Sequence, residues 1–197
     1  TSAQIGKLTS DQIGSLTSTQ VTAFDRSQIG FLKTDQISVL SSAAISKLTN
    51  TQIGFLSTGQ IKALTSSQIG SLTSAQVTSL KNFQILALST DQISTLSSDT
   101  IRSLSAAQVK ILTTAQLKSI TPEIVSTLTT SQFVNITATG IGSFTPDQLV
   151  AIGTTGASKL SASQVKLLTR SQADAFSTDQ LNAMIVPVRA FVNKLKS

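Results

Sequence analysis

The stretch "TSDQIGSL", residues 9–16, decides the fold, because the chain repeats it with small changes along almost its whole length. The next eight residues read "TSTQVTAF", and residues 65–72 read "TSSQIGSL". From Thr1 to Met184 the sequence divides without insertion or deletion into 23 octads, followed by the thirteen-residue tail "IVPVRAFVNKLKS". The consensus is [S/T]-x-x-Q-[I/V]-x-x-L, with an apolar residue at positions 5 and 8 of every octad. A short fixed period of this kind indicates a repeat protein.

The spacing of the two apolar positions indicates that each octad forms its own helix. Apolar residues recur at separations of 3 and 5, a mean of 4.0, whereas one face of a continuous helix needs about 3.6. In a strand, positions 5 and 8 would point to opposite faces because their separation is odd. The two positions share a face only within a short helix, where residues three apart are neighbours.

Capping signals support one helix per octad. Ser or Thr at position 1 and Gln at position 4 form a capping box, in which each side chain bonds the other residue's backbone amide. Pro122 and Pro146 fall at position 2, the first helical residue, where proline is tolerated. Seven of the nine acids fall at position 3, and eight of the twelve bases within the array fall at positions 6 or 7, as the helix dipole favours. The predicted N-caps include Thr9, Thr17, Thr49, Thr65 and Thr73.

These observations predict an all-α fold, a solenoid or superhelix of very short capped helices with one helix per octad. Helices of two turns are not stable alone in water, so they must bury positions 5 and 8 against neighbouring octads. Glycine at position 6, as in Gly14 and Gly70, weakens a helix and therefore predicts close approach of a neighbouring backbone there. The predicted core residues include Ile13, Leu16, Ile53, Leu56, Ile69 and Leu72.

A longer period is superimposed on the octads. Residues 9–48 and 65–104 are identical at 25 of 40 positions after a shift of seven octads. One explanation is duplication of a block of octads. The other is that seven octads complete an integral number of superhelical turns, so that equivalent faces recur.

The consensus weakens toward the C-terminus. The octad "GTTGASKL", residues 153–160, lacks the cap, the Gln and the Ile together. We therefore predict a regular solenoid over residues 1–152, followed over residues 153–197 by degenerate repeats and a C-terminal capping segment of the same continuous domain, as repeat arrays need atypical ends.

The tail is expected to form a helix from about Pro187. An alternative interpretation of "VRAFVNKLKS", residues 188–197, is a basic amphipathic helix that binds a membrane or a partner. In the capping interpretation, the residues that cover the end of the core are Ile185, Val186, Val188, Phe191, Val192 and Leu195.

Composition argues against catalysis. Ser and Thr make up 59 of the 197 residues, and there is no Cys, His, Trp or Tyr. The usual nucleophile–base pairs and zinc sites need His or Cys, and the Ser and Thr residues are explained as caps. We predict no enzyme activity, no cofactor and no metal site. The net charge of +6 raises the question of nucleic acid, but aromatics suited to stacking are too few for us to expect it. No apolar run is long enough to predict a membrane span.

The array resembles tracts of [S/T]xxQ[I/V]xxL octads in very large secreted or surface proteins of Gram-negative bacteria, adhesin- or hemagglutinin-like. The resemblance covers residues 1–152 well and residues 153–184 loosely. It implies a stalk, spacer or fibre-forming segment at the bacterial cell surface or outside the cell. Because the sequence starts with Thr1 rather than Met and is already within the repeat array, we expect it to be part of, or processed from, a longer chain.

Two functions remain open. The first is a structural or adhesive solenoid that associates with itself, end to end or laterally, or with another surface protein or glycan. The second is a recognition solenoid that binds a protein, peptide or glycan in its superhelical groove. Phe31 and Phe55, both at position 7 and three octads apart, are the candidate exposed contacts. The alternative explanation for these two side chains is a wider core at their octads.

Overall fold

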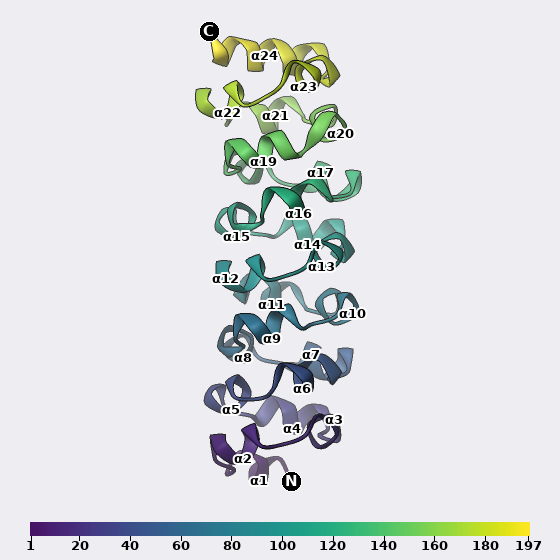
Figure 1. The fold of residues 1–197 in the computed structure, drawn as a ribbon, viewed down its shortest axis with the longest axis vertical. Helices are drawn as coiled ribbons and strands as arrows, with labels where there is room; N and C mark the ends of the chain where they lie inside the picture. The colour runs from purple at the N-terminus through teal and green to yellow at the C-terminus, as the bar shows by residue number, and fades with distance from the viewer. The chain divides into compact units, whose positions relative to one another are not determined.

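The computed structural model describes all residues, 1–197, and contains helices joined by short turns, with no strand (Figure 1). Each octad forms one short helix, so the all-α prediction is confirmed. The chain separates into two compact units, Thr1–Ser103 and Leu104–Ser197, which are described separately below. The boundary expected between residues 152 and 153 stays a prediction.

The first unit holds thirteen helices: α1 (Ser2–Ile5), α2 (Ser10–Gly14), α3 (Ser18–Thr22), α4 (Arg26–Phe31), α5 (Thr34–Ser38), α6 (Ser42–Lys47), α7 (Asn50–Phe55), α8 (Thr58–Ala63), α9 (Ser66–Gly70), α10 (Ser74–Thr78), α11 (Asn82–Ala87), α12 (Thr90–Ser94) and α13 (Ser98–Ser103). The second unit holds eleven: α14 (Ala106–Lys110), α15 (Thr114–Ser119), α16 (Pro122–Ser126), α17 (Thr130–Asn135), α18 (Ala138–Gly142), α19 (Pro146–Ala151), α20 (Gly153–Ala157), α21 (Ala162–Val165), α22 (Arg170–Asp174), α23 (Thr178–Ala183) and α24 (Val186–Lys196).

Extended residues at the octad boundary make the chain turn sharply. Leu64, at position 8, has φ −59° and ψ 133°, and Thr65, the next cap, has φ −69° and ψ 159°. Two consecutive residues outside the helical region end α8 and start α9 in a new direction. Because the same local sequence recurs, the same turn recurs, and the chain winds into a solenoid.

In both units each helix packs against the helix three octads away. In the first unit α1 packs on α4, α4 on α7 and α7 on α10, and in the second α14 packs on α17 and α17 on α20. Hydrogen bonds described below join octads four places apart within each unit. One superhelical turn therefore takes between three and four octads. Two turns take between six and eight, a range that includes the seven-octad shift in the sequence.

Backbones approach closely at some of the glycines in position 6. A Cβ built on Gly70 would lie 3.2 Å from the Thr95 carbonyl oxygen, and one on Gly14 would lie 3.4 Å from that of Val39. In both pairs the approaching backbone belongs to the octad three places later. This close approach is what compensates for the weaker helix propensity of glycine at these sites.

The tail forms α24, which packs on α21 and α22. Its buried stripe consists of Val188 and Val192, both fully buried, which are four residues apart on one helix face. The expectation that Ile185 and Val186 also cover the core is wrong, since they are 56% and 67% exposed. Ile185 is the N-cap rather than a helical residue, and Val186 lies off the buried stripe. Phe191 and Leu195 are half-buried.

Candidate binding surface

The Ser and Thr hydroxyls at position 1 cap the helices. In α9, the Thr65 Oγ1 accepts from the Gln68 backbone amide at 3.2 Å, and the Gln68 Oε1 accepts from the Thr65 amide at 2.7 Å. The hydroxyls are thus engaged by backbone amides, which supports their interpretation as caps rather than nucleophiles. The same reciprocal pair occurs at the other predicted caps, Thr9, Thr17, Thr49 and Thr73.

The side chains expected in the core lie inside the first unit, with one exception. The buried ones are Ile13, Ile53, Leu56, Ile69 and Leu72. Leu16 is only partly buried. Its octad is the second of the array, so within residues 1–197 no octad lies three or four places earlier to pack against it. Gln12 and Gln20 are exposed for the same reason.

The glutamines at position 4 have a second role that the sequence reasoning missed. In the first unit, the Gln68 Nε2 donates to the carbonyl oxygens of Ile37 at 3.0 Å and Leu40 at 2.6 Å, in the octad four places earlier. Gln36 is the first to reach such a partner, bonding Leu8 at 2.6 Å. In the second unit Gln148 repeats the pattern. We call these bonds the glutamine ladder.

A signal for the ladder was present in the sequence. A capping box accepts Glu as readily as Gln, and the helix dipole favours Glu in the first turn. Position 4 nevertheless holds Gln in 18 octads and Glu in none. The box needs only the Oε1 acceptor, so the exclusive use of Gln indicates a required Nε2 donor. No spacing in the sequence, however, indicates which carbonyl oxygens accept the hydrogen bond from this Nε2.

Phe31 and Phe55 point to the outside of the first unit. Their side chains are 60% and 45% exposed, so they do not widen the core. Phe55 is also flanked by cations from two other octads. The Arg26 Cζ, from α4, lies 4.7 Å from the centre of the Phe55 ring, and the Lys81 Nζ lies 5.4 Å from it. Lys81 also lies 5.8 Å from the ring of Phe83, which is 49% exposed.

We call Arg26, Phe55, Lys81 and Phe83 the cation–phenylalanine cluster. Cations over exposed rings stabilise the arrangement by about 0.5–1 kcal/mol per pair. No Asp or Glu occurs between Asp35 and Asp91, and the acid nearest to the cluster in the sequence is Asp25, which directly precedes Arg26. The cluster therefore offers flat apolar rings with cations beside them, a chemistry that suits ring-bearing and anionic ligands.

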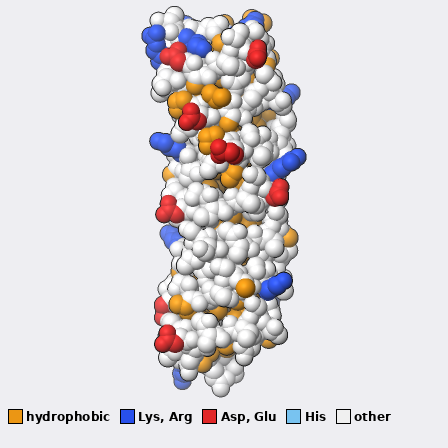
Figure 2. Space-filling view, in the orientation of Figure 1, with side chains coloured by type: hydrophobic (Ala, Val, Ile, Leu, Met, Phe, Trp, Pro, Cys, Tyr) orange, Lys and Arg blue, Asp and Glu red, His pale blue; other side chains and the backbone are white.

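Elsewhere the charged groups are few and dispersed. Most of the face in Figure 2 is uncharged, with acids and bases scattered over it. Exposed Arg170 and Asp174 form an ion pair. The pKa of Glu123 is lowered by hydrogen bonds to its own backbone amide and to the Thr121 side chain, at the first turn of α16. No group of three or more His, Cys, Asp or Glu side chains is arranged to hold a metal ion.

The fold and surface define a helical repeat protein. In comparison with known families, the ALTTAQ repeat model matches residues 32–66 and 51–82, which together span residues 32–82 of the first unit. In that region the chain is similar to ALTTAQ repeats, which confirms the resemblance to a tract of short octad-like repeats. No curated protein matches the sequence. None of the helices is long and apolar enough to cross a bilayer, and the longest, α24, has eleven residues.

Proposed function

We propose that this chain is a structural and adhesive repeat segment of the bacterial cell surface or extracellular space, serving as a stalk, spacer or fibre-forming element. The observation that carries the proposal is the glutamine ladder. Each octad with the ladder bonds the octad four places earlier in the same way, as Gln68 and Gln76 do. An array built by such repeated bonds can be lengthened without a new kind of contact.

The surface chemistry supports the same proposal. The exterior is rich in Ser and Thr, and charged residues make up only 12% of the chain. The resemblance to octad tracts of large Gram-negative surface proteins supports the proposed location, and the proposal includes no catalytic step. The partners we propose are a second copy of the chain, joined end to end or laterally, or another surface protein or glycan.

Two measurements test this function. The first is negative-stain electron microscopy of the purified chain at low and high concentration, with small-angle scattering. Filaments support a fibre-forming role, whereas discrete particles at every concentration contradict self-assembly and leave the spacer role. The second is protease treatment of intact cells that express the protein. Loss of the octad epitope supports surface exposure, and protection until the cells are lysed contradicts it.

A recognition solenoid is a second candidate function, favoured by the cation–phenylalanine cluster. Its test is binding of the labelled chain to surface glycans and proteins from cell envelopes, comparing wild type with Phe55→Ser. The matched control is Val150→Ser, at an exposed apolar residue of the second unit. Selective loss of binding in Phe55→Ser supports recognition through the cluster. Equal binding by both variants removes the cluster as the recognition surface.

A further inference from the structure

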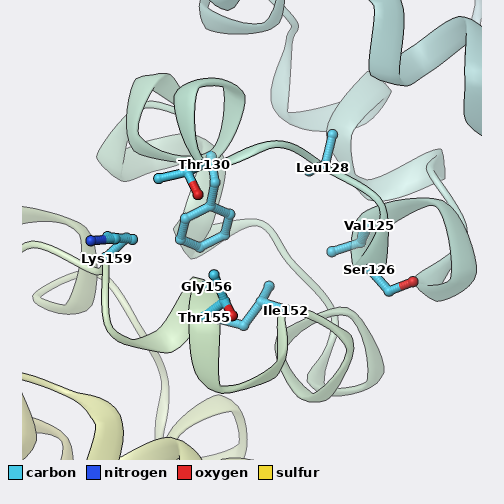
Figure 3. Close-up of a pocket in the computed structure, with 9 residues that line it drawn as sticks. Val125, Ser126, Leu128, Thr130, Ile152, Thr155, Gly156 and Lys159 are labelled. Carbon is cyan, nitrogen blue, oxygen red and sulfur yellow. The ribbon is translucent and has the colours of Figure 1, made fainter.

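A cavity in the second unit lies where the glutamine ladder is interrupted. It has a volume of about 200 Å³ and is lined by Val125, Ser126, Leu128, Thr130, Phe133, Ile152, Thr155, Gly156 and Lys159. Figure 3 shows Val125, Ser126 and Leu128 on one side, Ile152, Thr155 and Gly156 on another, and Lys159 to the side opposite Leu128. In Figure 2 apolar side chains reach the surface at the height of α16–α20 in Figure 1.

The sequence explains why the cavity lies there. Gly156 occupies position 4 of its octad, where most octads carry the ladder Gln. In the preceding octad the Gln148 Nε2 donates to Leu117 and Ile120, residues 31 and 28 positions earlier. The same separations from position 156 lead to Val125 and Leu128, two of the residues that line the cavity. The cavity is therefore next to the two carbonyls that a ladder Gln would bond.

The octad that should receive the bond has kept the receiving geometry. Thr121 is extended at the cap, α16 follows, and the Leu128 amide donates to the Val125 carbonyl at 3.2 Å, as the Ile120 amide does to the Leu117 carbonyl at 3.4 Å. No donor in the chain reaches the Leu128 carbonyl oxygen, whereas the equivalent carbonyl of Ile120 accepts from Gln148 at 2.6 Å. Binding of a ligand donor to such an acceptor, with release of water, is favourable in free energy.

The other glycine at position 4 in this unit leaves no such space. A Cβ built on Gly140 would lie 2.7 Å from the side chains of both Ile136 and Leu117, so neighbouring residues occupy the room of the missing Gln. A Cβ built on Gly156 would also lie 2.7 Å from a side chain, but this side chain belongs to Ile152 in the preceding turn. No side chain of the chain itself fills the cavity beyond it.

We propose that this cavity is a binding site for a carboxamide group on a short aliphatic stem, such as the side chain of glutamine. The amide NH₂ of the ligand would donate to the Leu128 and Val125 carbonyls, as the Gln148 Nε2 does to Leu117 and Ile120. The stem would contact Val125, Phe133 and Ile152, which are all buried apolar residues. The inference does not depend on the proposed function.

Charge selects the carboxamide over other donors. An ammonium group could also donate to the two carbonyls, but no acid lines the cavity and Lys159 does. A ligand cation would be desolvated beside a like charge, which costs free energy. A neutral carboxamide avoids this cost, and its oxygen can accept from the Lys159 ammonium or from the Thr130 hydroxyl.

The test is an NMR titration of the full chain with N-acetyl-glutamine methylamide, following the amides and methyl groups of Val125, Leu128 and Ile152. We expect saturable shifts at these residues, with a Kd of about 1 mM for so small a ligand. N-acetyl-leucine methylamide has an apolar stem without the amide and should bind at least about tenfold more weakly, about 1.4 kcal/mol. Propionamide, the carboxamide without a peptide backbone, distinguishes a small-molecule site from a peptide site.

Paired variants link the shifts to the cavity. Thr130→Trp places a large ring at the mouth and should weaken binding of N-acetyl-glutamine methylamide at least about tenfold. Thr114→Trp is the matched control, because Thr114 is also exposed at position 2 and lines no part of the cavity. Ser126→Trp serves as a second blocking variant if Thr130→Trp is unstable. Equal binding by the leucine compound, equal binding by the blocking variants, or no saturable shift at about 10 mM would each overturn the proposal.

Discussion

Two consecutive octads of the second unit, residues 145–152 and 153–160, differ in how much one side chain does. In the first, the Gln148 Oε1 accepts from the Thr145 amide at 2.8 Å, and the Nε2 donates to Leu117 and Ile120. In the second, Gly153 and Gly156 replace the cap and the glutamine. Gly153 has φ 62°, a left-handed conformation that favours glycine, and only Ile152 separates α19 from α20.

The comparison shows that the glutamine joins local and long-range structure. One end of its amide closes the first turn of its own helix, and the other end fixes an octad four places earlier. Gln148 is almost fully buried, so each bond that it makes replaces one that water would otherwise supply. Where the glutamine is absent at Gly156, the chain loses the cap and the long-range bond together, and a cavity remains.

The largest effect is expected for Gln148→Glu. The carboxylate can still accept from the Thr145 amide, but its second oxygen would face the buried Leu117 and Ile120 carbonyls instead of donating to them. We expect a loss of about 3 kcal/mol in the free energy of unfolding, measured by urea denaturation at neutral pH. The matched control is Gln12→Glu, at an exposed Gln without a long-range partner, which should change stability by less than about 0.5 kcal/mol.

The pH dependence sharpens this prediction. Burial beside carbonyl oxygens should raise the pKa of the introduced carboxyl in the folded Gln148→Glu variant. Protonation then favours the folded state, so the stability deficit should be smallest below the unfolded pKa and grow as pH rises through the folded pKa. If Gln148→Glu is as stable as wild type at neutral pH, the glutamine acts only as a cap, and the ladder contributes nothing.

Leu149→Ala tests the packing beside the ladder and should have nearly as large an effect. Leu149 is fully buried at position 5, and its truncation leaves a cavity that the short helices cannot collapse around. We expect a loss of about 3 kcal/mol, measured by thermal or urea unfolding. Val150→Ala, at the exposed neighbour, is the control and should be close to neutral. A small effect at Leu149 would mean that the ladder, and not the apolar core, holds this octad.

Thr145→Ala should have a moderate effect, because it removes one half of a capping box. The Thr145 Oγ1 accepts from the Gln148 backbone amide at 3.2 Å. We expect a loss of about 1 kcal/mol, measured by urea denaturation. Thr154→Ala, in the octad without a capping box, is the control and should change little, since Thr154 is exposed. Equal effects at both residues would contradict the distinction between the two octads.

The smallest effect concerns pH and Glu123, at the first turn of the octad that lines the cavity. Hydrogen bonds lower the pKa of this carboxyl in the folded protein. The bonded carboxylate therefore contributes stability above its unfolded pKa of about 4.3, and loses it as pH falls through the folded value. Glu123→Gln should remove a small part of the acid sensitivity of unfolding, measured by urea denaturation across the acid range. An unchanged acid profile would mean that this exposed carboxyl contributes no measurable stability.

Much of the fold could be predicted from the sequence because its causes are local. The cap at Thr65, the glutamine that reciprocates it and the apolar pair Ile69 and Leu72 lie within one octad. Their spacing excludes a strand and a continuous helix on geometric grounds alone. Only part of the candidate binding surface could be predicted from the sequence. Phe31 and Phe55 stood out at position 7, but no sequence pattern placed Arg26 and Lys81 beside the ring of Phe55.

The sequence by itself determined one capped helix per octad, the buried positions 5 and 8, and the sharp turn between helices. Only the tertiary structure decided the packing of each helix on the helix three octads away, and the ladder bonds to carbonyls 28 to 31 residues earlier. It also decided that Gly156 leaves a cavity while Gly140 does not. The physical reason is range: capping acts within a turn of helix, whereas these contacts depend on where the superhelix brings distant octads.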